Sequence, residues 1–186
     1  MLQLPQEKQV AILDRWRELI LSSYPADAAA FFGRQKDRFA NPVGEAIRRG
    51  TAVLLGGVLA DESPSSAPMT EALDALVRIR AVQDFTPAQA VAFVFRLKQA
   101  FREVLAPPPR EGDFPVELDA RVDGLALAAF DHYTRCREQI YDIKVREIRN
   151  RTARRFTRAD LSFEDTANKS NQDNGGDGSG DKGAAR

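Results

Sequence analysis

Val77-Arg-Ile-Arg-Ala-Val-Gln-Asp-Phe-Thr-Pro-Ala-Gln-Ala-Val-Ala-Phe-Val-Phe-Arg-Leu-Lys-Gln-Ala-Phe101 is the stretch that decides the fold of this chain of 186 residues. The spacing of Thr86, Pro87 and Gln89 predicts a helix start. The Thr86 hydroxyl can accept a hydrogen bond from the Gln89 amide, and the Gln89 side chain can accept one from the Thr86 amide. Pro87 suits the first helical position, where its missing N–H costs nothing.

The helix that follows carries a wide apolar face. Its apolar side chains recur at helical spacing as far as about residue 106: Ala90, Phe93, Val94, Leu97, Phe101, Val104 and Leu105. A face this rich is not stable in water, so other helices must cover it. The three prolines at 107–109 end the helix.

The remaining apolar periodicity predicts an all-α fold, a helical bundle of about five to six helices with a long C-terminal helix. The other helices are expected at residues 5–24, 26–33, 42–60, 69–82 and 116–158. Asn41 is the expected N-cap of the helix at 42–60, and Gly33 is expected to close the short helix before it. Trp16 lies in the middle of an apolar stripe and is predicted to be a core residue rather than a ligand-stacking ring.

Four glycines lie in the predicted helix at 42–60: Gly44, Gly50, Gly56 and Gly57. Each lowers the helical propensity by roughly 1 kcal/mol relative to alanine. We favour a packing role, in which another helix approaches closely, over a hinge. The spacing is not that of a phosphate-binding loop, and no strand precedes it.

The last helix carries an apolar seam with steps of three and four: Leu118, Val122, Leu125, Ala129, Tyr133, Cys136, Ile140 and Ile143. A helix of about 40 residues would be about 60 Å long. It is therefore expected to project, to pair with a second copy or to bend near Gly124. We assign residues 1–160 to a helical domain and the polar residues 161–186 to a disordered tail.

Composition excludes several classes of function. Lys plus Arg equals Asp plus Glu, 27 each, so no net field attracts the chain to nucleic acid. A single cysteine excludes an internal disulfide and fits a reducing compartment. The N-terminus lacks a signal-peptide pattern, and no apolar run approaches the ~20 residues of a membrane span. A cytoplasmic location is expected, with peripheral membrane association only through a partner.

No residue pattern indicates catalysis, so we expect no enzyme. His132 and Cys136 are the only histidine and the only cysteine, and they are four residues apart on a helix. They are candidates for binding a cofactor, but two ligands are too few for a closed zinc site. A thiol on an apolar seam is usually a small core residue. We therefore expect no metal and no cofactor, and no triad is supported.

The end of the last helix is strongly basic and forms the candidate partner-binding surface. Its residues are Lys144, Arg146, Arg149, Arg151, Arg154, Arg155 and Arg158. Aromatic residues for base stacking are nearly absent there, so nucleic acid is not the expected partner. A solvated face and a docking surface for an acidic protein partner are the two interpretations. Arg78 and Arg80, before the central cap, either bind a small anion or form structural ion pairs, and we favour the structural role.

Three segments resemble the N-terminal domain of RsbRD-type RsbT co-antagonist proteins. They are Val77–Phe95, Arg38–Ile47 and Cys136–Thr152, and in order and spacing they cover roughly residues 8–160. The resemblance implies a helical input domain from bacterial stress signalling, of the kind found in stressosome-type assemblies. In such proteins this domain feeds a C-terminal STAS domain through a connecting helix.

The resemblance also implies limits. Related input domains include globin-like folds without haem, so a globin-like bundle is an alternative fold. The sequence has only the polar tail after the basic helix and no STAS domain, so phosphorylation and kinase binding by STAS are not carried over. The resemblance supplies no catalytic or ligand-binding residue of this chain.

Together these features predict a non-enzymatic regulatory or sensory protein that acts through protein–protein contacts, as a homodimer through its last helix. One alternative is an accessory subunit that docks on a larger redox or membrane-associated complex. Another is a small-ligand or haem sensor, with a cavity around Phe93, Phe95 and Leu97 and with His132 or Cys136 nearby.

Overall fold

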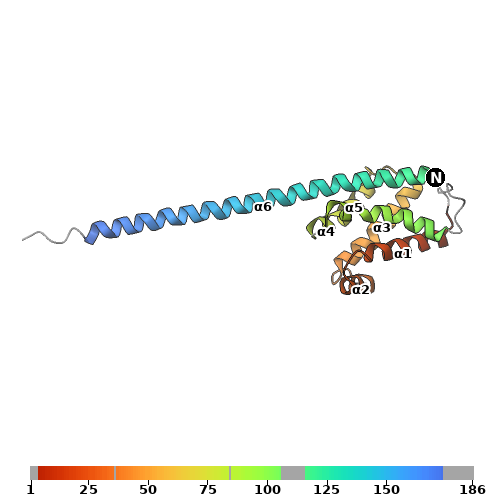
Figure 1. Ribbon diagram of the computed structural model, residues 1–186, viewed down its shortest axis with the longest axis horizontal. Helices are drawn as coiled ribbons and strands as arrows, with labels where there is room; N and C mark the ends of the chain where they lie inside the picture. The colour runs from red at the N-terminus through yellow and green to blue at the C-terminus, as the bar shows by residue number, and fades with distance from the viewer. Residues whose placement is uncertain (1–3, 36, 84, 106–115, 174–186) are drawn as a thin grey trace, which may run out of the picture. The chain divides into compact units, whose positions relative to one another are not determined.

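The computed structural model describes residues 4–35, 37–83, 85–105 and 116–173, with the side chains of the last helix described as far as residue 154. Within these residues every regular element is a helix, which confirms the predicted all-α fold (Figure 1). The helices are α1 (Gln6–Leu21), α2 (Ala26–Arg34), α3 (Pro42–Ala60), α4 (Ala67–Val82), α5 (Pro87–Val104) and α6 (Val116–Asp173).

The chain divides into two compact units, Met1–Ile140 and Tyr141–Arg186. We call them the first and the second unit. The first unit contains α1 to α5 and the beginning of α6, and it holds the hydrophobic core. The second unit contains the remainder of α6.

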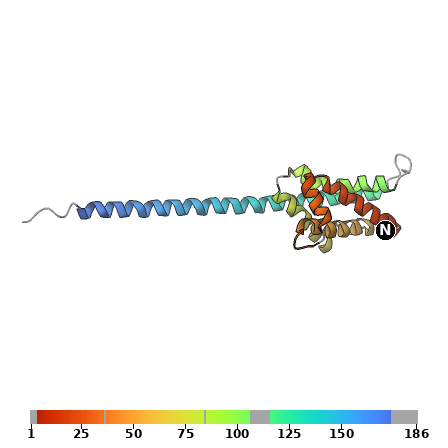
Figure 2. The same ribbon diagram turned by 90° about the horizontal axis from the view of Figure 1, so that it is seen from below.

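The apolar face of α5 is buried in the core of the first unit, as predicted. α1 packs along α5, and α3 packs along α4 (Figure 2). Trp16 of α1 is fully buried, and its indole N–H donates a hydrogen bond to the carbonyl oxygen of Phe93 at 2.7 Å. The seam of α6 is buried in the same core from Leu118 to Cys136. Trp16 is therefore a core residue, as expected.

Both predicted N-caps are present. The Thr86 hydroxyl accepts from the Gln89 amide at 3.3 Å, and the Gln89 side chain accepts from the Thr86 amide at 2.9 Å. The Asn41 side chain accepts from the Gly44 amide at 2.8 Å. Its Nδ2 donates to the carbonyl oxygens of Phe32 and Gln35, at 2.9 and 2.8 Å. Asn41 thus starts α3 and also binds the end of α2.

The glycines of α3 have different environments. A Cβ atom added at Gly50 would lie 2.9 Å from the side chain of Leu76, and one at Gly57 would lie 2.2 Å from the sulfur of Met69. These two glycines therefore let α4 approach α3 closely, as predicted. Gly56 has no atom within 4 Å of such a Cβ, so close packing does not require a glycine there.

Three expected helix ends differ from the structure. α1 ends at Leu21 rather than at Tyr24. Gly33 lies inside α2, which ends at Arg34 and is followed by the extended residue Gln35. α6 ends at Asp173 rather than near residue 158, and it passes through Gly124 without a break. The physical reason is that neither glycine nor proline occurs between Gly124 and Gly175. Residues 161–173, expected as part of a disordered tail, are helical, whereas residues 174–186 lie outside the described residues.

Arg80 is a buried charged residue of the core and is only 3% exposed. Its guanidinium carbon lies 5.3 Å from the ring centre of Tyr24, 5.0 Å from that of Phe85 and 5.3 Å from that of Phe93. Burial lowers the pKa of Arg80 from its ordinary value. Cation–π attraction to three rings offsets part of that desolvation cost.

The guanidinium of Arg80 also joins three segments. It donates one hydrogen bond to the carbonyl oxygen of Gln89 and one to the hydroxyl of Ser23, both at 3.2 Å. Arg78, two residues earlier, is exposed and pairs with Asp74 at 3.1 Å. The two arginines therefore have structural contacts, in agreement with the interpretation we favoured from the sequence.

Candidate interaction surface

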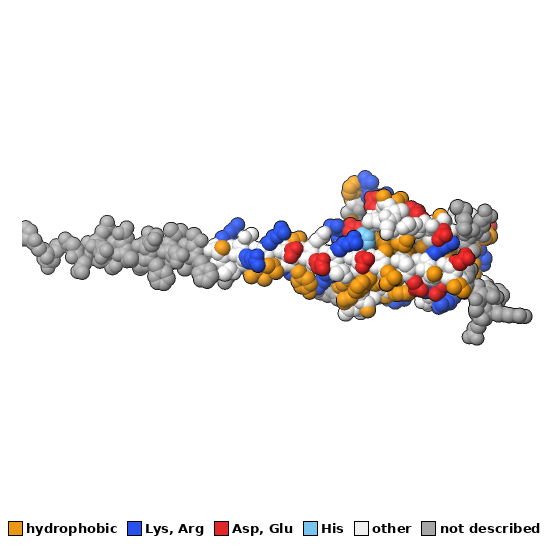
Figure 3. Space-filling view, turned by 90° about the horizontal axis from the view of Figure 1, so that it is seen from above, with side chains coloured by type: hydrophobic (Ala, Val, Ile, Leu, Met, Phe, Trp, Pro, Cys, Tyr) orange, Lys and Arg blue, Asp and Glu red, His pale blue; other side chains and the backbone are white. Residues whose placement is uncertain are grey.

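The second unit exposes apolar side chains on a helix. Tyr141 is 55% exposed, Val145 44% and Ile148 64%. Because they are four and three residues apart, these three side chains lie on one face of α6. We call this face the apolar stripe. In Figure 3 the apolar side chains of the second unit gather along one edge of the helix, and most of the basic ones lie along the other.

The same stretch of α6 carries the basic side chains that we predicted to bind a partner. Lys144, Arg146, Arg149, Arg151 and Arg154 are all exposed. Of these, Arg151 pairs with Glu147 at 2.8 Å, an exposed ion pair that contributes little to stability. The side chains of Arg155 and Arg158, which we also predicted to bind a partner, lie outside the described residues.

Three of these cations lie at the rim of the apolar stripe, one of them being Arg151, which is three residues after Ile148. Lys144 is three residues after Tyr141 and four before Ile148, and Arg149 is four residues after Val145. Residues at these spacings are neighbours on a helix surface. Any partner that covers the stripe therefore also meets the positive charges at its rim.

The predicted seam of α6 changes its surroundings at the boundary between the units. Its members are buried up to Cys136, Ile140 is half-buried against the core, and Ile143 is 64% exposed. The seam is thus a core face in the first unit. The apolar stripe is a different face, one residue later in register, and sequence reasoning missed it because the seam had the stronger periodicity.

The candidate cofactor ligands His132 and Cys136 both lie on α6, and His132 is half-buried. Cys136 belongs to the hydrophobic core, and burial raises the pKa of its thiol. Asp74 acts in the same direction, so the thiol stays protonated and unreactive near neutral pH. Among the described residues, no group of three or more potential ligands is placed to hold a metal ion.

The cavity expected around Phe93, Phe95 and Leu97 is not formed by these residues. Phe93 and Leu97 are buried in the core, whereas Phe95 is 48% exposed. Residues one or two positions apart on a helix do not share a face, and Phe95 is two positions from both Phe93 and Leu97. This spacing in the sequence already indicated that Phe95 points away from the other two. The three side chains therefore do not line one site.

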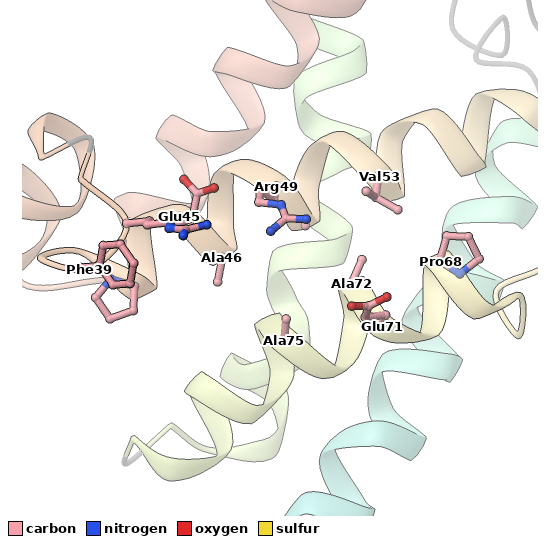
Figure 4. A pocket seen from close by; sticks show the side chains of 12 residues that line it. Phe39, Glu45, Ala46, Arg49, Val53, Pro68, Glu71, Ala72 and Ala75 are labelled. Atoms are coloured by element: carbon pink, nitrogen blue, oxygen red, sulfur yellow. The ribbon is translucent and has the colours of Figure 1, made fainter.

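A groove between α3 and α4 is a feature that sequence reasoning did not predict. Its volume is about 460 Å³, and it extends between Phe39 and Pro68 along the two helices (Figure 4). Gly50 and Ala72 form part of its floor. The small residues on α3 were visible in the sequence and could have indicated a groove. Only the packing of α4 beside them shows that the space between the two helices stays open.

No helix in the described part of the chain combines the length and the apolar character that crossing a membrane requires.

The chain matches a known protein family. Residues 10–148 match the family described as the RsbT co-antagonist protein rsbRD N-terminal domain. The match includes the first unit from residue 10 onward and the apolar stripe, and it ends at Ile148. Lys144 and Arg146 therefore lie inside it, and Arg149 to Arg158 lie beyond it. No curated protein and no solved structure matches the chain.

Proposed function

This chain belongs to the family of RsbT co-antagonist protein rsbRD N-terminal domains, and from that premise we propose that it is a non-enzymatic regulatory or sensory protein of bacterial stress signalling. Its output is contact with other proteins. The observation that carries the proposal is the exposed apolar stripe of Tyr141, Val145 and Ile148, which lies inside the matched region.

A second copy of the chain is the partner that we propose for the apolar stripe. Isolated helices are only marginally stable in water unless an apolar face is buried against another element. The steps of four and three between the stripe residues are those of a coiled-coil seam. In the first unit, α6 exposes Leu127 and Phe130 as well. Pairing of α6 with α6 would remove these apolar side chains from water.

The basic residues then have a separate role. Arg146 and Arg154 are not three or four residues from any residue of the apolar stripe, so they are not its neighbours on the helix surface. A dimer through the stripe therefore leaves them accessible. We propose that they, with the other cations at 144–158, dock an acidic surface of a further signalling protein. The free, buried thiol of Cys136 fits a reducing compartment, and we place the protein in the cytoplasm.

The test of the dimer is light scattering after size-exclusion chromatography on the full chain. Ile148→Asp places a carboxylate at the C-terminal end of the apolar stripe and is expected to raise the dissociation constant roughly 100-fold, because a charge would be buried on pairing. Asn150→Asp is the matched control, since residue 150 is two positions from Ile148 and does not share its face. Far-UV circular dichroism checks that both variants are helical.

A chain that ends after Ile140 provides an independent measurement, because it keeps the first unit and removes the second. It is expected to be monomeric. A full-length chain that is monomeric at the concentration of the experiment would contradict the dimer. The accessory-subunit alternative would then be the better proposal, with the basic residues as its docking surface.

Salt distinguishes pairing with a second copy from docking on an acidic protein. In a dimer through the apolar stripe, Lys144 and Arg149 of the two copies come close, and their like charges repel. Raising the ionic strength screens this repulsion, so the dimer is expected to become several-fold tighter. Lys144→Gln should reduce the dependence. Analytical ultracentrifugation at low and high salt measures it, and dimers that dissociate on adding salt would contradict this arrangement.

A further inference from the structure

The floor of the groove between α3 and α4 is built from residues that have no more than a methyl group as side chain. α3 contributes Ala46 and Gly50, and α4 contributes Ala72 and Ala75. At Gly50 the helices are so close that an added Cβ atom would lie 2.9 Å from Leu76. Close packing of the backbones therefore coexists with an open hollow of about 460 Å³ above them. This volume is in the range of small-molecule sites.

The walls of the groove are apolar and face water. Phe39 is 80% exposed and Val53 is 40% exposed, although both are large hydrophobic residues. Phe39 lies at one end of the groove and Pro68 at the other (Figure 4). A ligand with an apolar body would remove these surfaces from water, at about 25 cal/mol for each Å² buried.

The charges that line the groove are divided between its two sides. Glu45 pairs with Arg48 at 2.9 Å, and Arg38 lies over the ring of Phe39 at 4.6 Å. Within the described part of the chain, Arg49 of α3 and Glu71 of α4 have no hydrogen-bond or ion-pair partner, yet both line the groove. One side thus offers an unpaired guanidinium and the other an unpaired carboxylate.

We propose that this groove binds a small zwitterion with an apolar side chain, a free apolar amino acid being the simplest member of the class. The α-carboxylate would pair with Arg49, the α-ammonium with Glu71, and the side chain would lie on the floor at Ala46, Gly50 and Ala75. A simple carboxylate leaves Glu71 unpaired, and a simple amine leaves Arg49 unpaired. Charge complementarity therefore favours a ligand that carries both charges.

The proposed ligand site is separate from the interaction surface of the second unit, because all of its lining residues belong to the first unit. The inference does not rest on the dimer. A monomeric chain that binds the ligand would contradict only the proposed dimer, and a dimer that does not bind it would contradict only the ligand site.

The test is a titration of the ¹⁵N-labelled full chain with L-leucine, followed by NMR. Shifts are expected at the amides of Ala46, Gly50 and Ala72. The matched probes are 4-methylpentanoate, which lacks the ammonium group, and 3-methylbutylamine, which lacks the carboxylate. Each is expected to bind at least about 10-fold more weakly than leucine, as the loss of one charge-assisted contact implies.

Variants locate the site. Arg49→Gln and Glu71→Gln are each expected to weaken leucine binding about 10-fold, and Ala75→Leu is expected to abolish it by filling the groove. Ala75 is exposed, so the larger side chain does not disturb the core. Arg135→Gln, which removes an exposed guanidinium of α6 that does not line the groove, should leave binding unchanged.

Two results would overturn the proposal. One is the absence of shifts on α3 and α4 at leucine concentrations on the order of 10 mM, where even a weak site is occupied. The other is equal binding of leucine and 4-methylpentanoate, which would show that the ammonium group is not recognised. Shifts that persist in the Ala75→Leu chain would place the ligand elsewhere and would also contradict it.

Discussion

The Arg80→Ala variant is expected to unfold with a free energy about 3 kcal/mol lower than that of the parent chain. The reason is the position of the guanidinium between the rings of Tyr24, Phe85 and Phe93. Alanine would leave a cavity among three rings that can relax only partly. It would also leave the carbonyl oxygen of Gln89 without this donor.

Removal of the charge acts in the opposite direction, because burying a guanidinium costs free energy. Arg80→Met separates the two effects, since methionine fills most of the space but carries no charge and no donor. It is expected to cost less than Arg80→Ala. Urea unfolding followed by circular dichroism measures both, provided that the slope with urea is unchanged.

The matched control is Arg78→Ala, because Arg78 is on the same helix but has an exposed ion pair with Asp74. Its effect should stay within about 0.5 kcal/mol. If Arg80→Ala and Arg78→Ala were equally stable, the contacts of Arg80 with the rings would not be structural. The anion-binding interpretation of these arginines would then regain support.

The Gly44→Ala variant is expected to lower the free energy of unfolding by about 2 kcal/mol, although alanine is the better helix former. A Cβ atom at Gly44 would lie 2.1 Å from Nδ2 of Asn41 and 2.5 Å from the carbonyl oxygen of Phe32. The Asn41 side chain must then move, which breaks the N-cap of α3 and its bonds to the end of α2. The gain in helical propensity, about 1 kcal/mol, offsets only part of this.

Gly56→Ala on the same helix is the control, and its expected effect has the opposite sign. No atom lies within 4 Å of an added Cβ there. The chain should therefore gain up to about 1 kcal/mol from the propensity of alanine. The urea concentrations at which the two variants and the parent chain are half unfolded measure both changes in stability. A Gly44→Ala chain more stable than its parent would show that Asn41 does not need its present position.

Sequence reasoning predicted those parts of the fold that depend on neighbouring residues. The cap at Thr86, Pro87 and Gln89 involves atoms three residues apart, so its residue types were sufficient to place the start of α5. The apolar face behind it placed α5 in the core for the same reason. The expected helix ends at Tyr24, at Gly33 and near Arg158 were wrong, because residue types alone do not fix the last turn of a helix.

The candidate surface was predicted only in part. The basic residues at 144–158 are a property of composition and were found directly. The apolar stripe of Tyr141, Val145 and Ile148 was not predicted. The sequence of this helix has two apolar faces, the seam and the stripe, and only the packing of the helices shows that the core buries the seam. The division of the chain at residue 160 into a domain and a tail stays a prediction.

The sequence by itself determined that this protein is all helical, where most helices begin, and that its charges balance, because these features depend on local spacing and on composition. The tertiary structure alone decided which glycines are required, since Gly50 and Gly57 meet α4 whereas Gly56 meets no other atom. It also decided that Arg80 lies among aromatic rings contributed by three segments of the chain. The groove between α3 and α4 exists for the same reason, because it depends on which residues of two helices face one another.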